Sequence, residues 1–239
     1  MGMKTVREII VRVVNFFFNL ILPADSELEK LRTLDLNTIF SKLKRVSRQK
    51  YPGVFAIFSY KDVLVRKMIW HMKFRECKWF AEIFGKFLAT NIVRTISNSS
   101  GETGYEINVG NTNHIVMIPI PLHPKRFAER GYNQCEWLCE EIIKNICAEN
   151  EMNSNVPKIF YNKKILRRIK YRTKQSWSSR KERFQNSGGI FAVDDETCVA
   201  GRTFILIDDV VTTGATLNEA RRTLLAAGAS KVFCFVIAH

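Results

Sequence analysis

Apolar runs and one amphipathic segment alternate at the end of the chain. Apolar residues dominate 203–208 and fill most of 231–238, and the segment 216–227 between them has helical spacing. Gly228 follows that segment, and glycine commonly ends a helix because it adopts the left-handed conformation without strain. The pattern predicts a strand, a helix and a second strand, which form a complete βαβ unit.

The same alternation occurs earlier in the chain. The segments VFAIFSY (54–60) and HIVMIPIP (114–121) are typical of buried strands, whereas 61–90 and 133–148 show helical periodicity. Asp62 stands near the start of the first helical segment, where a carboxylate interacts favourably with the helix dipole. Strands that alternate with helices predict an α/β fold with a parallel sheet.

Three other segments have less regular patterns. The polar residues 24–50 predict helix and loop, and a basic loop, PLHPKRFAERGYN (121–133), follows the second strand. Between 158 and 193 the pattern is irregular, with short strand candidates at 165–171 and 189–193 on either side of a polar loop.

The first residues combine basic side chains with an apolar run. Arg12, Asn15 and Asn19 interrupt that run, which is shorter than the span of about 20 apolar residues that a transmembrane helix needs. A secretory signal would have an unbroken apolar core, so we expect a cytoplasmic chain without a transmembrane segment. An amphipathic helix that docks on the protein body or on a membrane surface fits the pattern better. We therefore expect an N-terminal helical extension at 1–50 and one domain at 51–239.

Positive charge is concentrated in two stretches of the chain. Lys and Arg number 37 against 23 Asp and Glu, which gives a net charge of +14. Residues 42–78 contain 11 basic and 2 acidic residues, and residues 158–183 contain 11 basic and 1 acidic residue. Such patches favour polyanionic partners such as phosphates, nucleic acid or an anionic membrane. Alternatively, they are solvated surfaces without a partner.

The segment FILIDDVVTTGAT (204–216) carries the most informative chemistry. Asp208 and Asp209 follow the apolar run, at the carboxyl end of a strand, where ligands bind in open parallel sheets. Two adjacent carboxylates repel each other, and a sugar with two neighbouring hydroxyls or a hydrated Mg²⁺ would offset that repulsion. The next residues can direct backbone N–H groups and hydroxyls at an anion: Thr212, Thr213, Gly214, Ala215 and Thr216. Together these groups suit a ribose 5-phosphate. The alternative interpretation of the segment is an ordinary turn whose carboxylates are merely exposed.

Two other phosphate-binding motifs are excluded in this segment. A P-loop needs GxxxxGK[ST], and a dinucleotide fingerprint needs GxGxxG, whereas the segment has one glycine and no lysine. The six cysteines form no CxxC pair, so we expect no structural metal site.

Three motifs resemble known proteins. ILIDDVVTTGAT resembles the phosphoribosyl pyrophosphate (PRPP) binding motif of type I phosphoribosyltransferases. PLHPKRFAERGYNQ (121–134) and RRIKYRTKQSWSSRKERFQNSGGIFAV (167–193) resemble the ComF family of competence-associated proteins. The likeness covers roughly residues 50–238. It implies a type I phosphoribosyltransferase-like α/β fold, with a parallel sheet flanked by helices and a small irregular hood.

The resemblance also implies roles for individual residues. Asp208 and Asp209 would contact the ribose hydroxyls, residues 212–216 would surround the 5-phosphate, and Mg²⁺ would accompany PRPP. Donors and cations on the loop after the second strand and on a loop that closes over the substrate would face the leaving pyrophosphate: His123, Lys125, Arg126, Arg130 and Arg180. Alternatively, the loop after the second strand is a basic surface loop that its prolines make rigid. For Arg180 the alternatives are nucleic-acid contact or simple solvation.

Two departures from the related families limit what the resemblance implies. Members of the ComF family often begin with paired cysteines that bind zinc, but LPADSELEKL (22–31) has none, so no zinc site is expected. Many purine phosphoribosyltransferases have an acidic residue where this chain has Thr212, so the acceptor stays unassigned.

Two functions fit these observations. The first is a PRPP- and Mg²⁺-dependent glycosyltransferase that transfers the phosphoribosyl group to an unknown acceptor. The second is a non-catalytic protein that handles single-stranded DNA during uptake, together with the competence machinery. Aromatic residues interleaved with basic ones at 158–184 favour the second function because bases stack on them: Phe160, Tyr161, Tyr171, Trp177 and Phe184. The same residues could instead fill the hood.

Overall fold

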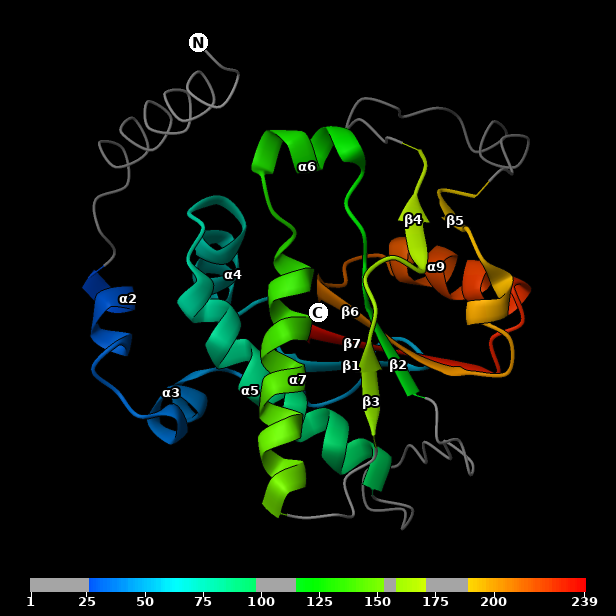
Figure 1. Ribbon diagram of the computed structural model, residues 1–239. Coiled ribbons are helices and arrows are strands. Elements are labelled where there is room, and N and C mark those ends of the chain that lie inside the picture. The colour runs from blue at the N-terminus through cyan, green and yellow to red at the C-terminus, as the bar shows by residue number, and fades with distance from the viewer. Residues whose placement is uncertain (1–25, 98–114, 153–157, 171–188) are drawn as a thin grey trace.

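A five-stranded parallel sheet forms the centre of the protein. The computed structural model describes residues 26–97, 115–152, 158–170 and 189–239 (Figure 1). The strands lie in the order β1-β7-β6-β2-β3, and neighbouring strands are parallel. Their bounds are β1 Val54–Phe58, β2 Ile115–Pro119, β3 Ile159–Tyr161, β6 Thr203–Val210 and β7 Lys231–Ala238. The predicted parallel α/β fold is confirmed.

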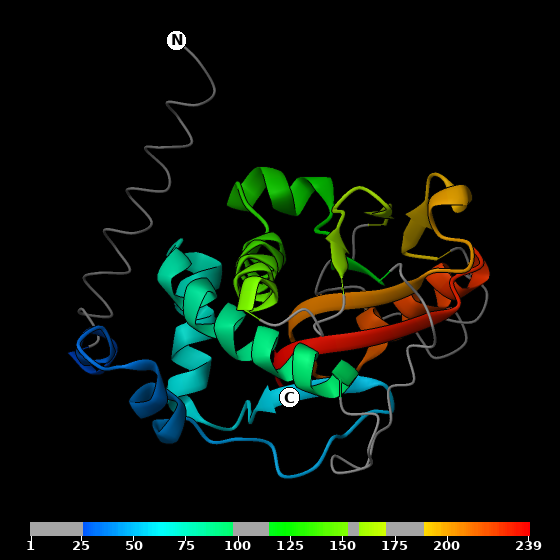
Figure 2. The same ribbon diagram turned by 60° about the horizontal axis from the view of Figure 1, so that its bottom comes forward.

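Helices cover both faces of this sheet (Figures 1 and 2). Their bounds are α2 Ser26–Leu31, α3 Leu36–Lys42, α4 Val63–Phe74, α5 Lys78–Ser97, α7 Gln134–Met152 and α9 Ala215–Ala226. Ile205 and Ile207 of β6 belong to the core shared with α4, α5 and α7, whereas Phe204 and Leu206 belong to the core shared with α9. Because successive strand residues point to opposite faces, only an unbroken apolar run buries both faces.

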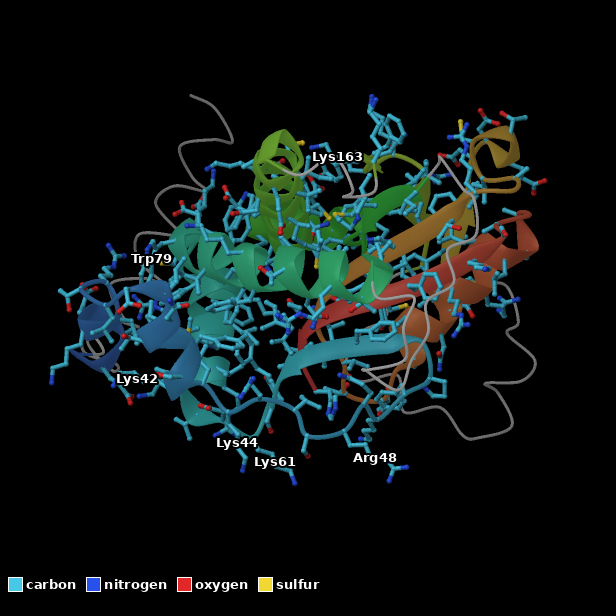
Figure 3. The ribbon with its side chains drawn as sticks, turned by 90° about the horizontal axis from the view of Figure 1, so that it is seen from below. Lys42, Lys44, Arg48, Lys61, Trp79 and Lys163 are labelled. Carbon is cyan, nitrogen blue, oxygen red and sulfur yellow. The ribbon has the colours of Figure 1, made fainter. Side chains whose placement is uncertain are left out.

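The segment between α3 and β1 covers the outer edge of the sheet. Arg45 pairs antiparallel with Phe58. The Gln49 side chain donates to the Ala56 carbonyl at 2.9 Å and accepts from the Ala56 amide at 2.8 Å. These bonds satisfy backbone groups that an open edge strand would expose. Figure 3 shows Lys44, Arg48 and Lys61 directed outward near this edge, and Lys42 directed outward at the end of α3.

The helical segment predicted at 61–90 is divided into α4 and α5. Asp62 is the N-cap of α4, where its carboxylate accepts from the backbone amides of Leu64 and Val65 at 2.8 Å and 3.3 Å. Glu76 lies between the two helices with φ of 53°. A residue in this left-handed region does not continue a right-handed helix, so the periodic pattern is interrupted there.

The basic loop predicted after β2 contains a helix, α6 (Pro124–Arg130). His123 is its N-cap and accepts from the Lys125 amide through Nδ1 at 3.2 Å, while Gly131 ends the helix with φ of 85°. The prediction of a loop was wrong because Pro124 stands at the first helical position, where proline favours a helix. No residue of α6 is buried, and Figure 1 shows the helix projecting above α7.

A small two-stranded sheet lies beside α9. β4 (Leu166–Arg168) and β5 (Phe191–Val193) fall within the two predicted strand candidates, and they pair antiparallel. Leu166 and Phe191 are buried in the core that also contains α9. A 3₁₀ turn, η1 (Glu196–Cys198), follows β5. The pattern did not predict β3, which has three residues and follows a polar stretch.

None of the helices in the described part of the chain is long and apolar enough to span a membrane. The helix predicted at the start of the chain and the polar loop that contains Arg180 lie outside the described residues. The division between residues 50 and 51 stays a prediction.

Candidate functional site

Two adjacent carboxylates lie at the carboxyl end of β6. The strand is two residues longer than predicted, because its pairing with β7 continues to Val210 and Ala238. Asp208 and Asp209 therefore belong to the strand itself. Asp209 is only 3% exposed, and Asp208 is half-buried. The sheet thus fixes the backbone of both carboxylates, and their oxygen atoms lie within 4.8 Å of each other.

Asp209 has partners from two helices. The Lys73 ammonium group, in the last turn of α4, lies 2.8 Å from Oδ1. The Gln134 side chain, at the start of α7, donates from Nε2 to Oδ2 at 2.6 Å. Burial alone would lower the pKa of Lys73, but attraction and hydrogen bonding to Asp209, with a further contribution from Asp208, raise the pKa above its usual value. Lys73 is therefore a cation at neutral pH.

Asp208 has weaker partners. Its Oδ1 accepts from the Asp209 amide at 2.9 Å and from the Cys135 thiol at 3.5 Å. Burial, followed by the charge of Asp209, raises the pKa of Asp208 to about 7. Burial also raises the pKa of Cys135, and both carboxylates add to that shift. Cys135 is therefore a neutral thiol, which can donate a hydrogen bond to Asp208.

The junction between α6 and α7 connects to the carboxylates. The Arg130 guanidinium donates to Oε1 of Gln134, whose amide group in turn donates to Asp209. Arg130 also lies 5.2 Å from the centre of the Phe74 ring. Asn133 fixes the junction, because it donates to the Ile120 carbonyl at 3.1 Å and accepts from the Cys135 amide at 3.0 Å. A cation of α6 is thus held beside the carboxylates by a short chain of hydrogen bonds.

The loop after β6 leads directly into the N-terminus of α9. Gly214 is the N-cap with φ of 75°, and it has no side chain that could accept from the first-turn amides. Thr212 and Thr213 are exposed, and the Thr212 carbonyl accepts from the Tyr51 hydroxyl at 2.5 Å. Thr213 Oγ1 accepts from the Ala215 amide at 3.4 Å. The first-turn amides and threonine hydroxyls therefore lie at a solvent-accessible helix N-terminus, which favours an anion.

The structure brings some of the predicted residues together. The carboxylates and residues 212–216 follow one another at one end of β6 and α9, and Arg130 joins the carboxylates through Gln134. His123 caps α6, and Lys125 and Arg126 are exposed on that helix. Arg180 lies outside the described residues.

Sequence reasoning missed Lys73 and Gln134. Lys73 follows the buried residue Met72 in a segment identified only by its apolar period. Its charge had no local signal that pointed to the carboxylates. Gln134 is the last residue of the PLHPKRFAERGYNQ motif, so the motif contained it without indicating its partner.

The donor atoms around the carboxylates suit a hard cation only in part. Oxygen and sulfur atoms of Asp208, Asp209 and Cys135 lie within 4.8 Å of one another. Mg²⁺ prefers oxygen ligands and retains water, so the carboxylates fit it and the neutral thiol does not. Lys73 already occupies one side of Asp209.

Comparison with known proteins gives one family match and several relatives. Residues 161–239 match the phosphoribosyl transferase domain family. Competence protein F of Haemophilus influenzae is 32% identical over 117 residues, which are 48% of this chain and 46% of that protein. Competence protein ComFC of Bacillus subtilis is 38% identical over 125 residues, 52% of this chain and 44% of that protein. DNA utilization protein YhgH of Escherichia coli O157:H7 is 29% identical over 116 residues, 48% and 45% of the two chains.

The matched segment spans about half the length of these curated relatives. Among solved structures, the allosteric regulatory enzyme of purine biosynthesis aligns with a TM-score of 0.36 and 16% identity, over 65% of this chain and 25% of that chain. This superposition is too weak to support an argument about the site. The strand order and the family match together identify a type I phosphoribosyltransferase-like fold.

Proposed function

Because the chain is a ComF-family protein with a phosphoribosyltransferase-like fold, we propose that it binds PRPP or a related ribose 5-phosphate. Asp208 and Asp209 accept hydrogen bonds from the ribose hydroxyls, and residues 212–216 hold the 5-phosphate. The observation that carries the proposal is the short path from paired carboxylates at the end of β6 to the N-terminus of α9. Carboxylates recognise hydroxyls, and a helix N-terminus recognises phosphate.

The same geometry supports a route to phosphoribosyl transfer. When pyrophosphate leaves the ribose, negative charge develops on it, and fixed cations stabilise that charge. Arg130 is held in place by Gln134, and Arg126 is exposed on the same helix. Mg²⁺ bound to PRPP would supply further positive charge. We propose that α6 directs these arginines at the pyrophosphate, with the acceptor left open.

The phosphate half of the proposal is tested with two glycine variants. Gly214 and Gly201 have φ of 75° and 71°, so alanine strains the backbone similarly at both positions, by about 1 kcal/mol. Only Gly214 lies in the loop that would hold the phosphate. We expect G214A to reduce the thermal stabilisation by PRPP and Mg²⁺, and G201A to keep it. In the wild type, ligand at roughly a hundredfold excess over its Kd stabilises by about 2.7 kcal/mol.

The proposal would be contradicted if PRPP with Mg²⁺ did not stabilise the wild-type protein. It would also be contradicted if G214A and G201A lost the same amount of ligand stabilisation. Pyrophosphate release with a panel of bases and amines then tests transfer. Loss of release in R126A and R130A, with PRPP binding retained, is the result expected for a transferase.

A second function, handling of single-stranded DNA, is favoured by exposed aromatic residues beside basic ones. Phe127 is 46% exposed on α6 next to Arg126, and Phe160 is 48% exposed on β3. The names of the relatives refer to competence and DNA utilization, so DNA and the competence machinery are candidate partners. A steep decrease of DNA affinity with salt would support this function. The slope should become shallower when Arg167, Arg168 and Lys170 are neutralised.

A further inference from the structure

Lys73 contacts Asp209, a carboxylate whose oxygens would otherwise be open to a sugar or a metal. Its ammonium group lies 2.8 Å from Asp209, and the two side chains are 23% and 5% exposed. By comparison, Lys67 of the same helix pairs with Glu27 of α2, and these side chains are 36% and 58% exposed. A pair as buried as the first loses much of its hydration and is an inefficient way to gain stability.

The end of α4 is held firmly at this place. Met68, Ile69 and Met72 anchor the helix in the core. The Tyr132 hydroxyl donates to the Lys73 carbonyl at 2.8 Å, and its ring stacks on Trp137 with centres 4.1 Å apart. The backbone of Lys73 is therefore fixed relative to α7, which carries the second partner of Asp209. The way α4 is held relative to α7 places Lys73 beside Asp209, so their ion pair is not a chance contact of a surface lysine.

Asp209 leaves little room for an additional cation. One of its oxygens faces Lys73, and the other accepts from Gln134. A carboxylate oxygen has a second lone pair, so a ribose hydroxyl can still donate to it. A divalent cation would instead lie close to the ammonium group, and like charges repel strongly in a partly buried site.

We propose that Lys73 is a positioning residue of the ribose site. Its ammonium group is the resident cation of the acidic pair, where it holds Asp209 against Gln134 and excludes free divalent cations. The role in sugar binding rests on the proposed function. The exclusion of cations concerns the protein alone. It follows that Mg²⁺ arrives with the pyrophosphate of the ligand and has no separate site on Asp208 and Asp209.

The test uses Mn²⁺ as a paramagnetic probe, with free Mn²⁺ measured by electron paramagnetic resonance and no sugar phosphate present. K73M removes the charge and retains the length of the side chain. K67M is the matched control, because it changes a lysine of the same helix whose partner is Glu27. We expect K73M to gain one Mn²⁺ site per chain, with affinity at least about tenfold above that of the wild type. K67M should behave as the wild type, and K73M combined with D209N should lose the new site.

Two results would overturn the inference: a folded K73M protein that gains no Mn²⁺ site, or a wild-type Mn²⁺ site that D209N removes. The second comparison needs no Lys73 variant, so it can overturn the inference even if K73M does not fold. A purely structural lysine would not create a metal site on removal. If PRPP fails to bind but K73M gains the site, the proposed function is wrong and the cation exclusion stands.

Discussion

At the scale of single residues, two neighbouring carboxylates have different chemistry because their partners differ. Asp209 faces the cation Lys73 and the amide of Gln134. Asp208 has a thiol and a backbone amide as donors, and the charge of Asp209 opposes its ionisation. One carboxylate is therefore paired with a cation and an amide, whereas burial and the charge of its neighbour raise the pKa of the other to about 7.

This difference predicts a pH dependence of stability. An unfolded aspartate has a pKa near 3.8, whereas the folded pKa of Asp208 is about 7. Between these values the folded state holds a proton that the unfolded state releases, so the contribution of Asp208 to stability decreases as pH rises. The groups that set the shift, Asp209, Lys73 and Cys135, remain in D208N. We expect urea unfolding to show D208N gaining stability relative to the wild type between pH 5 and pH 8. If the difference in unfolding free energy between D208N and the wild type did not change with pH, the assigned surroundings of Asp208 would be contradicted.

At the scale of elements, α5 and α7 approach closely at Gly85. A Cβ atom added there would lie 2.5 Å from Cβ of Glu141 and 3.4 Å from its backbone. We expect G85V to separate the helices and to lower the free energy of unfolding by about 2 kcal/mol or more. Lys86 is exposed on the same helix, so K86V should cost no more than about 0.5 kcal/mol. Chemical denaturation of both variants measures the difference, and equal losses would contradict the close approach.

The same scale shows which elements a sequence pattern can predict. Strands such as β7 have a long apolar run, and their pairing follows from burial on both faces. The helix α6 has no buried residue, so it leaves no apolar period, and only its N-cap and proline mark it. The division of 61–90 depends on the backbone conformation of Glu76, which its side-chain type does not indicate.

At the scale of the whole molecule, the candidate site combines local and distant parts. The carboxylates and the loop that we propose holds the phosphate are contiguous at 208–216, so the sequence was sufficient to place them together. Lys73 comes from a different helix, and its contact with Asp209 depends on how α4 packs against the sheet. The fold class was therefore predictable, as was the local motif, whereas the counter-cation of the motif was not.

The basic residues are also organised at this scale. Lys44, Arg48 and Lys61 are directed outward near the covered edge of β1, and Lys42 is directed outward beside α3 (Figure 3), whereas Lys73 is directed at the acidic pair. The first basic stretch of the sequence thus divides into an outward-facing group and a site residue. Net charge alone could not separate the two.

Calorimetric titration of the protein with PRPP in the presence of Mg²⁺ tests the central claim most directly. The double variant D208A/D209A removes the proposed acceptors of the ribose hydroxyls. D194A/D195A is the matched control, because it removes another adjacent carboxylate pair, one that is exposed beside β5. The account predicts binding to the wild type and to D194A/D195A, and loss of binding in a folded D208A/D209A protein. Binding that survives in D208A/D209A, or no binding to the wild type, would contradict it.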